Sequence, residues 1–127
     1  MKLTLFTDPH LGTRRAAHTT RDSSKKLTAA LYEQAMRIGT NAENPVCLGD
    51  LFDKSANPEE IIVQGFNVAS RCRWTLAGNH DCSNRADTVT SLDAIREMGC
   101  SIISSPNLHA PYFDVHGPLY FVPHHAS

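Results

Sequence analysis

The stretch LTLFTDPHLG, Leu3 to Gly12, decides how this sequence folds. A short apolar run predicts a buried strand, and Asp8 and His10 follow at its exit. Two later stretches repeat the arrangement: CLGDLFD, Cys47 to Asp53, and TLAGNHD, Thr75 to Asp81. In each of them, polar residues able to bind a metal ion come directly after an apolar run. The sequence therefore predicts three strand ends that carry chemistry.

The overall composition is that of one ordinary globular domain. The chain has 127 residues, of which 41% are hydrophobic and 20% charged, with a formal net charge of −1. This balance neither predicts nor excludes a polyanionic partner. No apolar run approaches the roughly 20 residues of a membrane span, and the N-terminus lacks the apolar region of a signal peptide. Four scattered cysteines without a C-x-x-C pair are expected to be reduced and packed, in a soluble protein of the cytoplasm.

Strands and helices alternate along the first hundred residues. The pattern predicts strands at Lys2–Phe6, Pro45–Leu48, Arg73–Ala77 and Cys100–Ser104, and helices at about 22–38, 57–70 and within 87–98. The expected boundary residues are Asp22 or Ser23, Gly39, Asn57 followed by Pro58, and Gly99. The aromatic-rich stretch PYFDVHGPLYFVP at 111–123 predicts an antiparallel hairpin. We therefore expect an α/β fold, a parallel sheet with crossover helices and a C-terminal hairpin.

Parallel strands bring their carboxyl ends to one edge of a sheet, where ligand sites form. The three polar motifs should therefore meet there, although about 40 and then 30 residues separate them in the sequence. Taken singly, each has an ordinary interpretation, since an Asp after a strand often caps a turn and Asn79 fits a left-handed turn. Together they offer two carboxylates, an imidazole and an amide. This mixture of oxygen and nitrogen donors suits Mn, Fe or Zn better than Ca.

The motifs D-x-H, GD-x-x-D and GNHD, in this order at three strand ends, resemble those of the calcineurin-like metallophosphoesterases. The resemblance implies a dinuclear centre in which Asp8 and His10 bind the first divalent ion. It also implies that Asp50 bridges to the second ion, which Asn79 binds. Mn is the expected metal, with Fe or Zn as alternatives. The implied fold is a β-sandwich flanked by helices, of which residues 1–127 would supply the N-terminal part.

The same resemblance assigns the catalytic residues. His80 would lie close to the scissile phosphate, with Asp81 beside it to orient the imidazole ring. The implied reaction is a two-metal hydrolysis in which water attacks phosphorus in line. His80 would stabilise the transition state or protonate the leaving oxygen.

The motif text narrows the branch of the family. Protein phosphatases of the superfamily carry GD-x-V-D-R-G and GNHE, whereas TDPHLG, GDLFD and AGNHD are similar to the nuclease subunit of the bacterial SbcCD complex and its archaeal, eukaryotic and phage relatives. This similarity implies a DNA exonuclease that works with an SbcC-like ATPase subunit. A second copy of the chain is a further candidate partner, and no membrane is expected. A small phosphodiesterase acting on nucleotides is the alternative enzyme.

The sequence departs from the family in one respect. The family completes its site with downstream histidines, two of them in a G-H-x-H turn, and the sequence ends at Ser127 without that motif. We therefore expect a domain truncated at its C-terminus that binds one metal ion weakly and the second barely. His124 and His125 are either incidental or a partial replacement. A catalytically incomplete metal-binding or interaction fragment stays open as the rival hypothesis.

A basic stretch follows the first motif. Arg14, Arg15 and Arg21 lie just before Lys25 and Lys26. They form either a solvated surface or an edge that contacts the phosphates of DNA, since such contacts supply most sequence-independent affinity.

Overall fold

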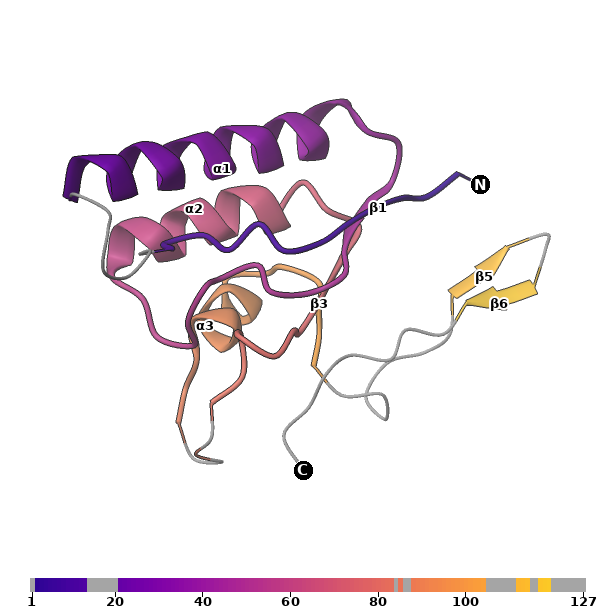
Figure 1. Ribbon diagram of the computed structural model, residues 1–127. Helices are drawn as coiled ribbons and strands as arrows, with labels where there is room; N and C mark the ends of the chain where they lie inside the picture. The colour runs from indigo at the N-terminus through magenta and orange to yellow at the C-terminus, as the bar shows by residue number, and fades with distance from the viewer. Residues whose placement is uncertain are drawn as a thin grey trace.

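The computed structural model describes residues 2–13, 21–83, 85, 88–104, 112–114 and 117–119, the side chains of 21–24, 112–114 and 117–119 excepted. Four parallel strands form one sheet in the order β1 (Thr4–Phe6), β2 (Pro45–Cys47), β3 (Trp74–Leu76) and β4 (Ile102–Ile103). The helices between them are α1 (Arg21–Asn41), α2 (Glu59–Ala69) and α3 (Ser91–Glu97). Strands β5 (Tyr112–Asp114) and β6 (Gly117–Leu119) pair antiparallel in a second sheet (Figure 1). The expected α/β fold and its hairpin are confirmed.

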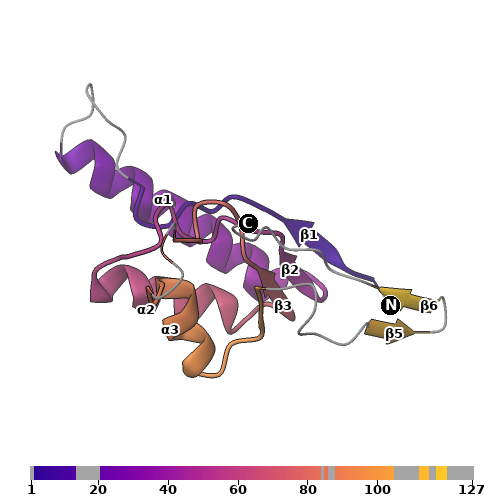
Figure 2. The ribbon, with the colours of Figure 1, turned by 90° about the horizontal axis from the view of Figure 1, so that it is seen from below.

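The helices pack together over one face of the parallel sheet. Both views show α1 and α2 side by side, and α3 contacts α2 (Figure 1 and Figure 2). The core joins Ala35 of α1, Val68 of α2 and Ile95 of α3 to the strand residue Cys47 and to Ala77. All five are at most 3% exposed. Burial of these apolar side chains is the main favourable contribution to folding, and it fixes the strand ends that carry the site.

A smaller apolar cluster lies on alternate residues of the same strands. Val46, Leu76 and Ile103 are its buried members, and Leu3 and Trp74 pack against them. The guanidinium of Arg73 lies 4.9 Å from the centre of the Trp74 ring. Trp74 is thus partly buried at the border of this cluster.

Two predicted boundaries of α1 are wrong. The helix begins at Arg21, so Asp22 and Ser23 lie inside it, and it continues through Gly39 to Asn41. A Cβ on Gly39 would come within 3.0 Å of the Cβ of Arg71. The glycine therefore serves close packing inside the helix, and it does not mark its end.

The predicted cap of α2 is also wrong. Pro58 occupies the cap position, with φ −65° and ψ 161°, and no side chain caps the helix. The Asn57 amide instead donates to the Lys54 carbonyl at 2.8 Å and to the Ser91 hydroxyl at 3.0 Å. By contrast, α3 lies within the predicted range and ends before Gly99, whose φ of 106° suits glycine.

Candidate metal centre at the carboxyl edge of the sheet

The turns that follow β1 and β2 run alongside each other beyond the end of the sheet. The Asp8 N–H donates to the Gly49 carbonyl and the His10 N–H to the Asp50 carbonyl, both at 3.1 Å. The Leu11 N–H donates to the Leu51 carbonyl at 2.8 Å. Parallel pairing therefore continues past the strands and aligns the first motif with the second.

The turn that follows β3 lies directly against the Asp50 turn. A Cβ on Gly78 would overlap both the backbone nitrogen and the carboxylate of Asp50. Gly49, with a φ of 137°, would bring a Cβ to 3.0 Å from the Gly78 Cα. Both positions require glycine, because any side chain there would separate the second and third turns.

Three of the expected metal ligands have a left-handed backbone conformation. The φ angles are 60° for Asp8, 46° for His10 and 52° for Asp50. This region is unfavourable for residues with a side chain, although Asp and His tolerate it better than most. Such outliers gather at functional sites, where the surrounding structure holds them in place.

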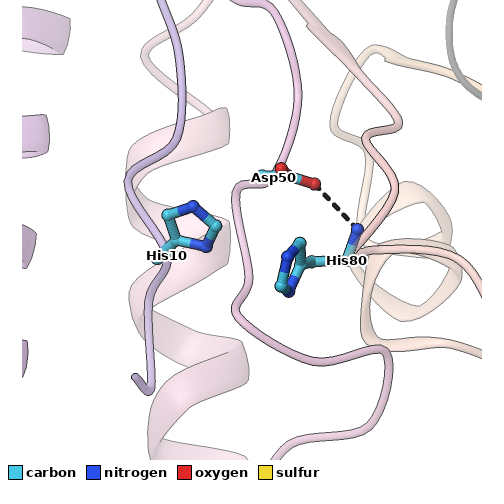
Figure 3. Close-up of side chains that lie close together, drawn as sticks. All are labelled: His10, Asp50 and His80. Carbon is cyan, nitrogen blue, oxygen red and sulfur yellow. Dashed lines mark hydrogen bonds between the residues drawn. The ribbon is translucent and has the colours of Figure 1, made fainter. Parts of the chain in front are cut away.

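His10, Asp50 and His80 bring their side chains together at this edge (Figure 3). One potential ligand atom from each lies within 4.8 Å of the other two. The two imidazole rings meet edge to face, with centroids 5.0 Å apart. The Asp50 carboxylate also accepts a 2.8 Å hydrogen bond from the His80 N–H. The structure thus joins one residue from each of the three motifs.

Asp53 lies beside both histidines, a position for which the sequence analysis assigned no role. Its carboxylate oxygen is 3.2 Å from His10 Nδ1 and 4.0 Å from His80 Nδ1. Its backbone carbonyl accepts a 2.8 Å hydrogen bond from His80 Nδ1. The second acid of GD-x-x-D was the signal for this contact. Sequence alone did not reveal it because the contact crosses between two turns.

Asp81, expected to orient the His80 ring, lies buried between the second and third turns. Asp81 is 2% exposed, and its two oxygens accept hydrogen bonds from the backbone N–H groups of Phe52 at 2.9 Å and Gly78 at 2.8 Å. Burial raises the pKa of this carboxyl, although these hydrogen bonds oppose the shift. Asp81 therefore ties the second and third turns together, while the Asp53 carbonyl holds the ring.

The family profile described as calcineurin-like phosphoesterase matches residues 1–126. The chain belongs to this family. A search of curated proteins finds none that matches the chain. The family implies a metal-dependent phosphoesterase.

The residues of the phosphoesterase site fit the metal ions that the family implies. His10 Nδ1 is buried and has no hydrogen-bond partner of good geometry, and its polar neighbour is the Asp53 carboxylate oxygen at 3.2 Å. Imidazole nitrogens and the Asp50 carboxylate form a donor set that borderline ions such as Mn, Fe and Zn accept. His10 and Asp50 are therefore suited to hold a metal ion, with His80 at its side.

The other expected ligands of the phosphoesterase lie at the margin of this group. A carboxylate oxygen of Asp8 is 3.6 Å from His10 Nε2. Asn79 is exposed and precedes His80 in the third turn. Among the expected DNA contacts, Arg14 and Arg15 lie outside the described residues, and only the backbone of Arg21 is described, at the start of α1. His124 and His125 also lie outside them.

The electrostatic surroundings favour a positive charge on His80. Its pKa is raised above the ordinary value, first by the hydrogen bond to the Asp53 carbonyl and then by the nearby Asp50, Asp53 and Asp81 carboxylates. The His80 side chain is 46% exposed, so the ring remains accessible from solvent.

No helix among the described residues is long and apolar enough to cross a membrane.

Proposed function

We propose that this phosphoesterase hydrolyses phosphodiester bonds in DNA as a nuclease of the SbcCD type. The single observation that carries hydrolysis is the meeting of His10, Asp50 and His80, one from each motif, at the carboxyl edge of the sheet. The DNA branch is supported by the motif text GDLFD and AGNHD, which differs from that of the protein phosphatases. The proposal places the enzyme in the cytoplasm, with an SbcC-like ATPase subunit as its protein partner.

Four residues are proposed to bind two divalent ions, with Mn first among the candidates. Asp8 and His10 would hold one ion, Asn79 the other, and Asp50 would contact both. When bound, such ions activate a water molecule and offset the charge of the phosphoryl oxygens. One Asp50 oxygen accepts a hydrogen bond from the backbone N–H of His80. The carboxylate is thereby held in place between the first and third motifs.

His80 is proposed as the proton donor for the leaving oxygen. The Asp53 carbonyl can only accept a hydrogen bond, so its 2.8 Å contact requires the proton of His80 to be on Nδ1. In the protonated ring Nε2 carries a second proton, and this is the proton that would pass to the leaving oxygen. The raised pKa of His80 keeps the ring protonated over a wider pH range, which suits a general acid.

Binding of the DNA strand is proposed to use the basic residues that follow the first motif. Arg14, Arg15 and Arg21 would contact phosphates without reading the base sequence. Lys25 and Lys26 of α1 are exposed and continue the basic stretch. A second copy of the chain would add a matching surface if the protein dimerises.

The direct test is hydrolysis of a DNA oligonucleotide by the chain in the presence of Mn, compared with its His80→Ala variant. Loss of the general acid should lower the rate by roughly 10²-fold or more. The thermal unfolding temperature should change little, because the side chain is half exposed. The exposed Glu33 on α1 gives a control, Glu33→Ala, with both properties unchanged. A His80→Ala protein that unfolds yet keeps its specific activity would contradict the role.

A second candidate is a metal-binding module without catalysis. Among the described His, Cys, Asp and Glu residues, one group is close enough to hold a metal ion, and it has three members. With only three protein donors, the remaining coordination positions of a metal ion would be filled by water, and the ion would bind weakly. Mn binding without hydrolysis of either DNA or a small nucleotide diester would favour this candidate. Hydrolysis of the nucleotide diester alone would identify a nucleotide phosphodiesterase.

A further inference from the structure

Asn57 links three segments that surround the site. Its amide nitrogen donates to the Lys54 carbonyl at 2.8 Å and to the Ser91 hydroxyl at 3.0 Å. Its amide oxygen would lie 3.1 Å from a Cβ placed on Gly12, two residues after His10. The amide thus contacts the turn after β2 and the start of α3, and faces the turn after β1.

The turn that Asn57 closes carries the carbonyl that holds His80. On one side, the Asp53 N–H donates to the Leu11 carbonyl at 3.0 Å. On the other side, Asn57 fixes the carbonyl of Lys54, the residue that follows Asp53. The Asp53 carbonyl between these two anchors accepts the hydrogen bond from His80 Nδ1. Its direction therefore depends on both anchors.

The start of α3 supplies a rigid support for this turn. The Ser91 N–H donates to the Ser55 carbonyl at 2.7 Å, and the Ser91 side chain is buried. Thr90 and Asp93 form a capping box that fixes the first turn of this helix. Asn57 does not cap α2, because Pro58 holds the cap position. Its hydrogen bonds thus serve the turn and α3.

We propose that Asn57 is a positioning residue of the site. By closing the turn onto α3, Asn57 directs the Asp53 carbonyl at the His80 ring. This carbonyl holds a proton on Nδ1, so that Nε2 is the nitrogen left for the phosphate. The importance of Asn57 for hydrolysis rests on the function proposed above. The hydrogen bonds through which it acts can be tested without any substrate.

The test is ¹⁵N NMR of the His80 ring in the metal-free chain, at a pH where the ring is neutral. The ¹⁵N shifts report how the single proton is shared between Nδ1 and Nε2. In Asn57→Ala we expect the ratio of Nδ1–H to Nε2–H to fall about fivefold, the change that loss of one net hydrogen bond produces. The control is Asn67→Ala, which removes a 3.0 Å hydrogen bond to the Tyr32 hydroxyl between α2 and α1. Asn67→Ala should lose similar stability and keep the ratio.

An unchanged ratio in Asn57→Ala would overturn the proposal, as would an equal fall in Asn67→Ala, which would indicate general loosening. Should Asn57→Ala fail to fold, Ser91→Ala removes the hydroxyl acceptor and keeps the backbone hydrogen bond to Ser55. A lowered ratio in Ser91→Ala would then support the role, and an unchanged one would refute it. Wild-type chain with the expected ratio but without hydrolysis would contradict the proposed function and leave the positioning role intact.

Discussion

The carboxyl edge of the sheet and the core beneath the helices differ in backbone strain and in burial. At the edge, Asp8, His10 and Asp50 hold left-handed backbone conformations, and the His80 ring is half exposed. In the core, Val68 and Ile95 are fully buried in ordinary helices. Strain and exposed charge destabilise the edge, while apolar burial in the core stabilises the chain. A site of this kind can exist only because the core holds the strand ends in place.

The largest effect should come from Gly78→Ala. The added Cβ would overlap Asp50 and push the third turn away from the second, because neither backbone has room to move without losing its pairing. We expect Mn to lose most of its stabilising effect on thermal unfolding in this variant. Calorimetric scans with and without Mn measure this, and an unchanged Mn-induced shift would show that the close approach is not needed.

Asp81→Asn should have a smaller effect than Gly78→Ala, and this effect should be on the stability of the fold. An amide offers only one acceptor oxygen, so either the Phe52 N–H or the Gly78 N–H would face an NH₂ group. Leaving one buried donor unpaired should lower the free energy of unfolding by about 1–3 kcal/mol. Urea unfolding at neutral pH measures this loss. Equal stability of the two proteins would mean that Asp81 does not tie the turns together.

The same carboxyl predicts a pH dependence. Its pKa in the folded chain lies above the ordinary value of 3.8, so the folded state binds the proton more tightly than the unfolded state. The Asp81 contribution to stability is therefore most favourable below that value, and it declines as pH rises through the folded pKa. Urea unfolding measured from acidic to neutral pH should show a decline in the free energy of unfolding of the wild type that Asp81→Asn lacks. A parallel pH profile in both proteins would exclude Asp81 as its source.

The smallest effects concern thiol chemistry in the core. Burial raises the pKa of Cys72 to about 11, and it raises the pKa of Cys47 as well. Little thiolate forms there at neutral pH, so native-state alkylation should be limited by unfolding. Cys82, near the site, is only partly buried and should react first. Peptide mapping after timed alkylation measures the order, and early labelling of Cys47 would show that the core opens locally.

The sequence predicted the sheet and the site with unequal success. Apolar runs followed by glycine or acids located β1, β2 and β3, because strands that pack on a core have strong composition signals. The expectation that β1 is buried was wrong, since it is an edge strand in which Leu5 is 56% exposed. The motifs that contain Asp50 and His80 were found because their polar residues directly follow these apolar runs. The role of Asp53, the tie made by Asp81 and the amide bridge of Asn57 were not predicted. Each includes a hydrogen bond between segments far apart in the sequence, and its partners depend on how these segments pack.

Helix boundaries show the same limit. Gly39 and Asn57 are residues that often end or begin helices, yet here Gly39 allows close packing against Arg71 and Asn57 serves a neighbouring turn. Thr90 and Asp93, by contrast, form a local capping box within four residues. Tertiary contacts therefore decided the boundaries of α1 and α2, and local chemistry decided the start of α3.

The most direct test of the account is a Mn titration of the wild-type chain and its Asp50→Asn variant, followed by thermal unfolding. Asp50 is the carboxylate where the three turns meet, and metal binding to the folded state alone raises the unfolding temperature by mass action. We predict that the unfolding temperature rises with Mn in the wild type and that Asp50→Asn loses most of this rise. An equal rise in both proteins would contradict the claim that the three strand ends form a metal centre around Asp50.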